Sequence, residues 1–189
     1  MPLKVISMIP PSITIYFKEK ELVADSSSLA VAMAWDYAQT HRITVSADMQ
    51  LWRTPAGKPY LSYPQIKLSL SDSDQYWLAA FSVTEIGVDL QQHIDCRKEA
   101  LAQRFFHTDE YHWLQNQHFD PFFAVWAAKE SYAKYTGEGL TSFKHFSVVD
   151  GQGIAKKINN VELMLVPFQP GYTLAVCADV IADINIKRA

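Results

Sequence analysis

The first third of the chain shows apolar and polar positions in the order expected for a strand, a helix and a second short strand. Strand-like alternation covers residues 13–17, and helical spacing covers residues 28–40, with a serine at 26 or 27 as the expected N-cap. A further strand at residues 50–53 leads into the sequence TPAGKPY, whose prolines and glycine predict a turn. Both kinds of element are therefore expected here.

The middle of the chain changes from strands to helices. The runs QYWLAAFSV and EIGVDLQQ are strand-like and follow each other with almost no linker, which predicts an antiparallel pair. The run RFFHTDEYHWLQNQ predicts a helix with Thr108 as its N-cap and two acidic residues in its first turn, where carboxylates favour the helix dipole. Pro121 then starts another helix, which should end at Gly137 or Gly139.

The last third predicts three more strands, with the sequences FKHFSVVD, VELMLVPF and YTLAVCADV. Each half of the chain then contains both helix and strand, and this pattern predicts an α+β fold. A boundary near residue 84 is the natural division. It gives an N-terminal lobe at residues 1–84 and a C-terminal lobe at residues 85–189.

Composition narrows the class of protein. The 189 residues are 49% hydrophobic and 13% aromatic, which is enough to build a sizeable core. The formal charge is -3, and no basic block occurs in the sequence. Because nucleic-acid binding requires clustered positive charge, we expect no nucleic acid as a partner.

The cysteines and the N-terminus bear on location. Cys96 and Cys177 lie in unrelated segments without zinc-like spacing, which favours a reducing cytoplasm. The apolar start MPLKVISMIPPSITIYF is interrupted by Pro10 and Pro11, and no cleavage-site pattern follows it. We therefore expect a cytoplasmic protein with neither a signal peptide nor a membrane span.

The strand EIGVDLQQ combines an apolar face with a polar one. Its period of two sends three aliphatic residues to one side, namely Ile86, Val88 and Leu90. Asp89 and Gln91 point to the other side, and Gly87 leaves room beside Asp89 for a close approach by another group. A strand at a sheet edge with a polar face in solvent would explain the same pattern.

Two adjacent charges, Lys129 and Glu130, lie in the apolar sector of the predicted helix. That sector also holds Phe122, Phe123, Trp126 and Ala133. Charged residues are rarely buried unless something pairs with them. An exposed ion pair of Glu130 with Lys134, spaced i, i+4, would explain Glu130 but not Lys129.

If Asp89 and Glu130 converge, the chemistry becomes specific. Two carboxylates with the amide oxygen of Gln91 form an oxygen donor set that suits Mg²⁺. Lys129 and Lys134 would add positive charge for a phosphate, and the reaction implied is a phosphoryl-type transfer.

Three separated stretches carry a resemblance to a known family. They are GKP at 57–59, IGVDL at 86–90 and WAAKESYAKYTGEGL at 126–140, with RFFHTDE at 104–110 in agreement between them. With these motifs the chain resembles the phosphopantetheinyl transferases of the larger, monomeric class, over roughly residues 50–150. That family moves the phosphopantetheine arm of coenzyme A onto a serine of an acyl or peptidyl carrier protein.

The resemblance implies roles for the charged centre. Asp89 and Glu130 match positions that bind Mg²⁺ beside the coenzyme A diphosphate, and Glu130 also matches the carboxylate that helps deprotonate the serine. Gln91 stands where many members have a second acidic residue. Lys134 matches the lysine on the phosphate under attack, and Lys129 another lysine of the coenzyme site.

The resemblance also places the nucleotide and the fold. Lys58 and Pro59 lie in the turn that borders the nucleotide. Ser71, Asp72 and Ser73 stand where the family usually has Ser-His-Ser, so Asp72 replaces a histidine that contacts the 3′-phosphate. Two similar α+β lobes in a pseudo-twofold arrangement, with the ligand between them, are implied for a monomer.

The implied macromolecular partner is an acidic carrier protein that docks near residues 92–118 and the helix that follows them. Arg97, Lys98 and Arg104 are candidate contacts, although each would equally suit an ordinary solvated surface. The alternative function is a non-catalytic relative that binds a carrier or another partner. Asp72 and the expected helix at 28–40, which contains no Lys or Arg, favour that alternative. The retained Asp89, Glu130 and Lys134 oppose it.

Overall fold

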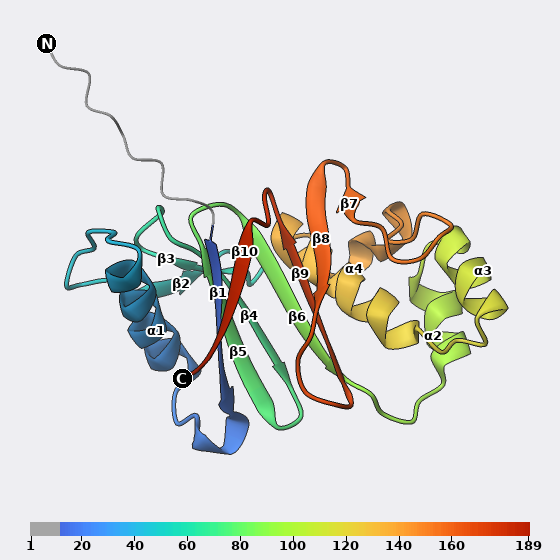
Figure 1. Cartoon of the computed structure of the whole chain (residues 1–189), viewed down its shortest axis with the longest axis horizontal. Coiled ribbons are helices and arrows are strands. Elements are labelled where there is room, and N and C mark those ends of the chain that lie inside the picture. The colour runs from blue at the N-terminus through green and yellow to red at the C-terminus, as the bar shows by residue number, and fades with distance from the viewer. Residues whose placement is uncertain (1–11) are drawn as a thin grey trace, which may run out of the picture.

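A computed structural model describes residues 12–189 of the chain, and two four-stranded sheets lie at its centre (Figure 1). The first sheet has the strand order β10-β1-β5-β4 and consists of β1 (Ser12–Glu19), β4 (Lys67–Ser73), β5 (Tyr76–Ser82) and β10 (Asp183–Arg188). The second has the order β6-β9-β8-β7 and consists of β6 (Ile86–Gln92), β7 (Lys157–Ile158), β8 (Val161–Val166) and β9 (Tyr172–Ala178). A separate hairpin is formed by β2 (Leu51–Arg53) and β3 (Pro59–Leu61).

The described residues form four α-helices, namely α1 (Ser26–Thr40), α2 (Lys98–Phe105), α3 (Thr108–Asn116) and α4 (Phe122–Thr136), with short 3₁₀ helices η1 (Lys20–Leu22) and η2 (Leu140–His145). Of the four, α1 and α4 pack directly on the sheets. The separate helices and largely antiparallel sheets confirm the predicted α+β class. No helix within residues 12–189 is long and apolar enough to cross a bilayer. Most of the apolar start that bears on a signal peptide, residues 1–11, lies outside the described residues, and the rest of it belongs to β1.

The two sheets pack against each other through an apolar core. Alternate residues of β1, β5, β6 and β9 supply it: Ile13, Ile15, Leu78, Ala80, Ile86, Val88, Leu90, Leu174, Val176 and Ala178. The opposite face of the first sheet packs against α1, and the opposite face of the second packs against α4 (Figure 1). The layers are therefore helix, sheet, sheet and helix. A pseudo-twofold relation between the halves stays a prediction.

The predicted helices are present, but two of their N-caps differ. Asp25, rather than a serine at 26 or 27, caps α1 by accepting hydrogen bonds from the backbone N–H groups of Ser27 and Ser28. His107, rather than Thr108, caps α3 in a capping box with Glu110. In both cases the cap lies at least one residue earlier, where a side-chain acceptor reaches the free N–H groups. The predicted end of α4 is confirmed, because Gly137 is left-handed with φ 82°.

The predicted pairing of QYWLAAFSV with EIGVDLQQ is wrong. The first run, β5, pairs with β1 and β4, whereas the second, β6, pairs with β9 in the other sheet. The short link between the two strands therefore carries the chain from one sheet to the other. The physical reason is burial: β5 is a central strand with partners on both edges, and the apolar face of β6 packs into the core between the sheets. The expected lobe boundary near residue 84 falls in this link.

Two further differences concern the last third. The segment FKHFSVVD is not a regular strand, because residues Leu140–His145 form η2 and an isolated bridge joins Val149 to Ile154. Its apolar residues Phe143, Phe146 and Val148 are buried against the helices instead of in a sheet. The predicted strands β8 and β9 are confirmed. An additional strand, β10, pairs in parallel with β1, so the end of the chain completes the first sheet.

Candidate active site

A cleft of about 480 Å³ lies where β4, β6, α4 and the β2–β3 hairpin meet. Most of the site residues predicted from the sequence line it: Lys58, Pro59, Ser71, Asp72, Asp89, Gln91, Glu130 and Lys134. Arg53 also lines the cleft and was missed from the sequence, where its place just before the turn TPAGKPY was the available signal. The cleft thus brings carboxylates and cations from both halves of the chain together.

Gly87 allows β6 and α4 to touch, and this contact places Asp89. A Cβ atom at Gly87 would lie 1.9 Å from the backbone oxygen of Ser131 and 2.5 Å from the backbone nitrogen of Tyr135. The predicted close approach at Gly87 is therefore confirmed. The polar face of β6 meets a helix rather than solvent, and Asp89 is only 3% exposed.

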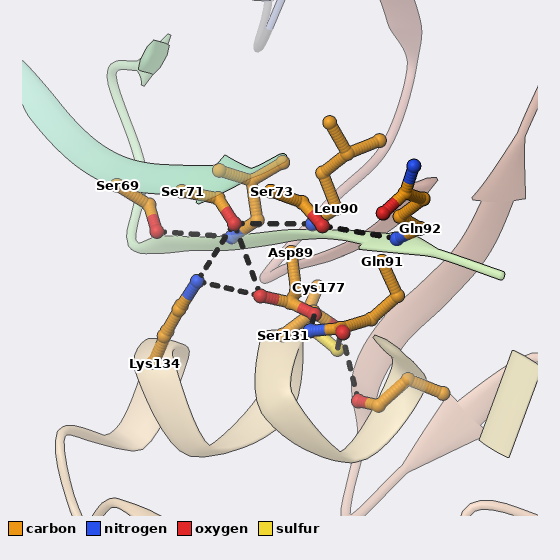
Figure 2. Close-up of polar contacts among 12 residues, drawn as sticks. Ser69, Ser71, Ser73, Asp89, Leu90, Gln91, Gln92, Ser131, Lys134 and Cys177 are labelled. Atoms are coloured by element: carbon orange, nitrogen blue, oxygen red, sulfur yellow. Dashed lines mark hydrogen bonds and ion pairs between the residues drawn. The ribbon is translucent and has the colours of Figure 1, made fainter. Parts of the chain in front are cut away.

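Asp89 is held by three side chains (Figure 2). Its Oδ1 atom accepts hydrogen bonds from the Lys134 ammonium at 2.7 Å and from the Ser71 hydroxyl at 3.0 Å. Its Oδ2 atom accepts a hydrogen bond from Gln91 Nε2 at 2.8 Å. Lys134 thus pairs with Asp89 across the cleft wall, and within residues 12–189 it forms no ion pair with Glu130. The exposed i, i+4 pair considered from the sequence is absent there.

Glu130 lines the same cleft without a hydrogen-bond partner among the described residues. Burial raises the pKa of its carboxyl to about 7, and the nearby charge of Asp89 adds to the increase, while Lys134 opposes it. A carboxyl group with a pKa near neutrality can take up and release a proton under physiological conditions. Glu130 therefore has the chemistry of a general base.

The same two carboxylates fit a magnesium ion. Asp89 and Glu130 repel each other, and Glu130 has no partner within residues 12–189, so a cation between them would offset both costs. The described residues contain no group of three or more His, Cys, Asp and Glu suited to a metal. Mg²⁺ does not need one, because it usually takes one or two carboxylates and completes its shell with water and phosphate oxygens. Gln91 directs its N–H group to Asp89, so it first of all supports that carboxylate.

Lys58 joins the hairpin to the end of α4. Its ammonium donates to the backbone oxygen of Tyr135 at 2.6 Å and to Glu85 Oε2 at 3.1 Å. A cation at the C-terminal end of a helix also interacts favourably with the helix dipole. Lys58 and Pro59 therefore border the cleft, with the charge of Lys58 already partly engaged by protein groups.

Ser71, Asp72 and Ser73 alternate in direction along β4, as a strand requires. Ser71 and Ser73 turn toward β6, where Ser73 accepts a hydrogen bond from the backbone N–H of Gln92 at 2.9 Å. Asp72 points away from them and forms an ion pair with Lys20. Of the three, Ser71 and Asp72 line the cleft, and Ser73 is not among its lining residues.

Lys129 does not reach the cleft, contrary to what the resemblance implies. Its ammonium is fully buried and donates to Glu110 Oε1 and to the backbone oxygen of Phe146, both at 2.8 Å. Neighbouring residues on a helix point about 100° apart, so Lys129 faces the interior while Glu130 faces the cleft. Its partner Glu110 lies in the first turn of α3, as predicted, and its side chain is fully buried. A lysine in an apolar sector was the signal that a buried acid had to exist.

The candidate docking residues lie away from the cleft at the start of the helical region. Arg97 is the N-cap of α2, and Lys98 and Arg104 belong to this helix. Lys98 lies over the ring of Phe123 at 5.5 Å and Arg104 over the ring of Phe105 at 5.0 Å. These cation–π contacts give both side chains a local structural role.

Comparison with known proteins identifies the family. A family profile described as the 4'-phosphopantetheinyl transferase superfamily matches residues 85–177. The chain is 31% identical to the 4'-phosphopantetheinyl transferase ffp of Bacillus subtilis over 70% of this chain and 64% of that protein. It is 30% identical to the 4'-phosphopantetheinyl transferase Sfp of Bacillus subtilis (strain 168) over the same shares. It is 37% identical to the 4'-phosphopantetheinyl transferase gsp of Aneurinibacillus migulanus over 44% of this chain and 36% of that protein.

The chain spans less than two thirds of the length of these relatives. The matched region nevertheless includes β6, which carries Asp89, and α4, which carries Glu130 and Lys134. Similarity in sequence and convergence in space thus concern the same residues, and the chain belongs to the 4'-phosphopantetheinyl transferase superfamily.

Proposed function

We propose that this protein transfers the phosphopantetheine arm of coenzyme A to a serine of an acyl or peptidyl carrier protein. The observation that carries the proposal is the convergence of Asp89, Glu130 and Lys134 in one cleft, inside the region that matches the family. Asp89 comes from β6 and the other two from α4, so an accidental motif match would not bring them together.

Each residue has a task in this reaction. The serine hydroxyl attacks the phosphorus that bears the pantetheine arm, its proton passes to Glu130, and the bond to the departing adenosine bisphosphate breaks. In the metal-free protein, burial raises the pKa of Glu130 to about 7, which makes its carboxylate a better proton acceptor than an exposed one. Lys134 offers an ammonium to the phosphate, where negative charge is stabilised in a partly buried site. Asp89 fixes Lys134 through their 2.7 Å ion pair.

Asp89 and Glu130 would hold Mg²⁺, with Gln91 beside them. The ion would supply positive charge to the diphosphate of coenzyme A. Lys58 and Pro59 would border the nucleotide, and Arg53 adds a further cation to the same wall. The chain's own contribution is therefore two carboxylates, one of which is also the base, and the Lys134 ammonium, with Lys58 and Arg53 on the wall beside the nucleotide.

Asp72 is the residue that favours the alternative, a non-catalytic relative. It lines the cleft where the resemblance places the 3′-phosphate, and like charges repel. Lys20 pairs with Asp72 and reduces this repulsion, although both side chains are more than half exposed, at 51% and 56%. We therefore propose weak but productive coenzyme A binding.

The proposed partner is an acidic carrier protein that docks over residues 92–118, near Arg97, Lys98 and Arg104. We propose a monomer, because both sheets and both walls of the cleft come from one chain. A reducing cytoplasm is the proposed location, supported by two cysteines that are both unpaired.

Intact-mass measurement tests the function. Apo acyl and apo peptidyl carrier proteins are incubated with the protein, Mg²⁺ and coenzyme A, and one arm should be added to the carrier. The Asp89→Ala and Glu130→Ala variants should remain folded and add none, because each removes a ligand from a site with few to spare. A native protein that binds a carrier but never changes its mass would support the non-catalytic alternative.

A further inference from the structure

The strand β6 lies at the edge of its sheet, and side chains rather than a strand cover that edge. Three backbone N–H groups of β6 donate to serine hydroxyls of β4 (Figure 2). Val88 donates to Ser69 at 3.0 Å, Leu90 to Ser71 at 3.1 Å and Gln92 to Ser73 at 2.9 Å. A row of serines thus joins the two sheets where buried N–H groups would otherwise be unsatisfied.

Ser71 differs from the two other serines in this row. Its hydroxyl also donates to Asp89 Oδ1 at 3.0 Å and accepts a hydrogen bond from the Lys134 ammonium at 3.0 Å. A hydroxyl group has one hydrogen to donate and two lone pairs that accept. Leu90, Lys134 and Asp89 therefore use the full hydrogen-bonding capacity of Ser71, which is only 6% exposed.

Lys134 keeps capacity that Ser71 lacks. An ammonium group has three N–H donors, and within residues 12–189 two of them bind Ser71 and Asp89. One donor remains for a substrate phosphate. The flexible stem of a lysine otherwise leaves its ammonium poorly placed, so two fixed acceptors orient the third donor.

We propose that Ser71 is a positioning residue that holds Asp89 and Lys134 at fixed separation, rather than a group that binds coenzyme A. This inference rests on the proposed transferase function. It changes the role implied by the resemblance, because a hydroxyl with three protein partners has no hydrogen bond left for a phosphate. Removal of Ser71 should then impair the chemical step more than the binding of coenzyme A.

The first experiment compares Ser71→Ala with the matched variant Ser69→Ala. Both remove one buried serine that accepts a hydrogen bond from β6, but among the described residues Ser69 forms no hydrogen bond with Asp89 or Lys134. Ser71→Ala should lower kcat roughly 10- to 100-fold, as small misplacements of reacting groups do, with the KM for coenzyme A nearly unchanged. Ser69→Ala should keep kcat within about twofold of the native value. If Ser71→Ala is too unstable to assay, Ser71→Cys preserves the size with weaker hydrogen bonds and should show the same split.

The second experiment needs no activity. A double-mutant cycle compares the urea unfolding midpoints of Ser71→Ala, Lys134→Met and the variant that carries both changes. A second cycle replaces Ser71→Ala with Ser69→Ala. The losses of stability should be clearly non-additive for Ser71 with Lys134 and additive for Ser69 with Lys134, because only the first pair shares a hydrogen bond.

The outcomes separate this inference from the proposed function. If the native protein modifies no carrier but the Ser71 and Lys134 cycle is still non-additive, the transferase function is refuted while the Ser71 contacts are supported. An additive Ser71 cycle would refute the contacts themselves. A higher KM for coenzyme A with an unchanged kcat in Ser71→Ala would show that Ser71 binds the coenzyme and would overturn the positioning role.

Discussion

The Gly87→Ala substitution tests the contact on which the site is built. Its new methyl group would lie 1.9 Å from the backbone oxygen of Ser131, whereas ordinary contact begins at 3.4 Å. The Ser131 oxygen and the Tyr135 nitrogen, which lies 2.5 Å away, both belong to the backbone, so no side-chain rotation can relieve the clash. α4 and β6 must then separate by about 1.5 Å, which is a large shift in a close-packed interior.

The cost of that shift falls on stability and on activity. Overpacking a core by one methyl group costs about 1–3 kcal/mol and sometimes more, and a clash with two backbone atoms should lie at the upper end. α4 carries Glu130 and Lys134, so its displacement also breaks the 2.7 Å contact between Lys134 and Asp89. Misplacement by about 1 Å can reduce a rate by roughly 100-fold.

Urea unfolding, followed by tryptophan fluorescence, and carrier modification, followed by mass, measure the two effects. Gly151→Ala is the matched control, because its new methyl group meets nothing within 4 Å although its φ of +86° disfavours alanine. The control should lose about 1 kcal/mol and keep its activity. If Gly87→Ala keeps native activity and loses no more stability than the control, the close packing of β6 on α4 is refuted.

Three other changes have defined outcomes. Lys129→Met should lower the free energy of unfolding by about 3–5 kcal/mol, because it leaves Glu110 buried without its cation; adding Glu110→Gln should recover part of this loss in urea titrations. In metal-free protein, Glu130 has a folded pKa of about 7 above its ordinary 4.5, so the folded state holds an extra proton between these pH values and stability falls as pH rises through that window. Glu130→Gln should remove this dependence and raise the Tm above pH 7 in chelator, and an unchanged Tm profile would contradict the raised pKa. Asp72→His should increase the preference for coenzyme A over dephospho-coenzyme A in calorimetric titrations, and equal selectivity before and after the change would show that Asp72 lies away from the 3′-phosphate.

The local pattern of the sequence was sufficient for the elements that carry the site. The period of two along residues 86–91 separates the core residues of β6 from Asp89, and Gly87 indicates a close neighbour. Pro121 and Gly137 bracket α4, and helical spacing places Glu130 one turn before Lys134. These features depend on backbone geometry within a few residues, so they can be predicted without knowledge of the rest of the chain.

Partners across the fold were decided only by the tertiary structure. Lys129 and Glu130 share a sector of the helical wheel, yet Lys129 is buried against Glu110 whereas Glu130 lines the cleft. β5 and β6 are neighbours in sequence, yet their apolar faces are better buried in two different sheets. The resemblance implies a coenzyme contact for Ser71, and only the fold shows the three protein groups that bond to its hydroxyl. Periodicity determines which residues share a face, whereas the group opposite that face comes from distant segments, whose arrangement depends on the burial and hydrogen bonding of the whole chain.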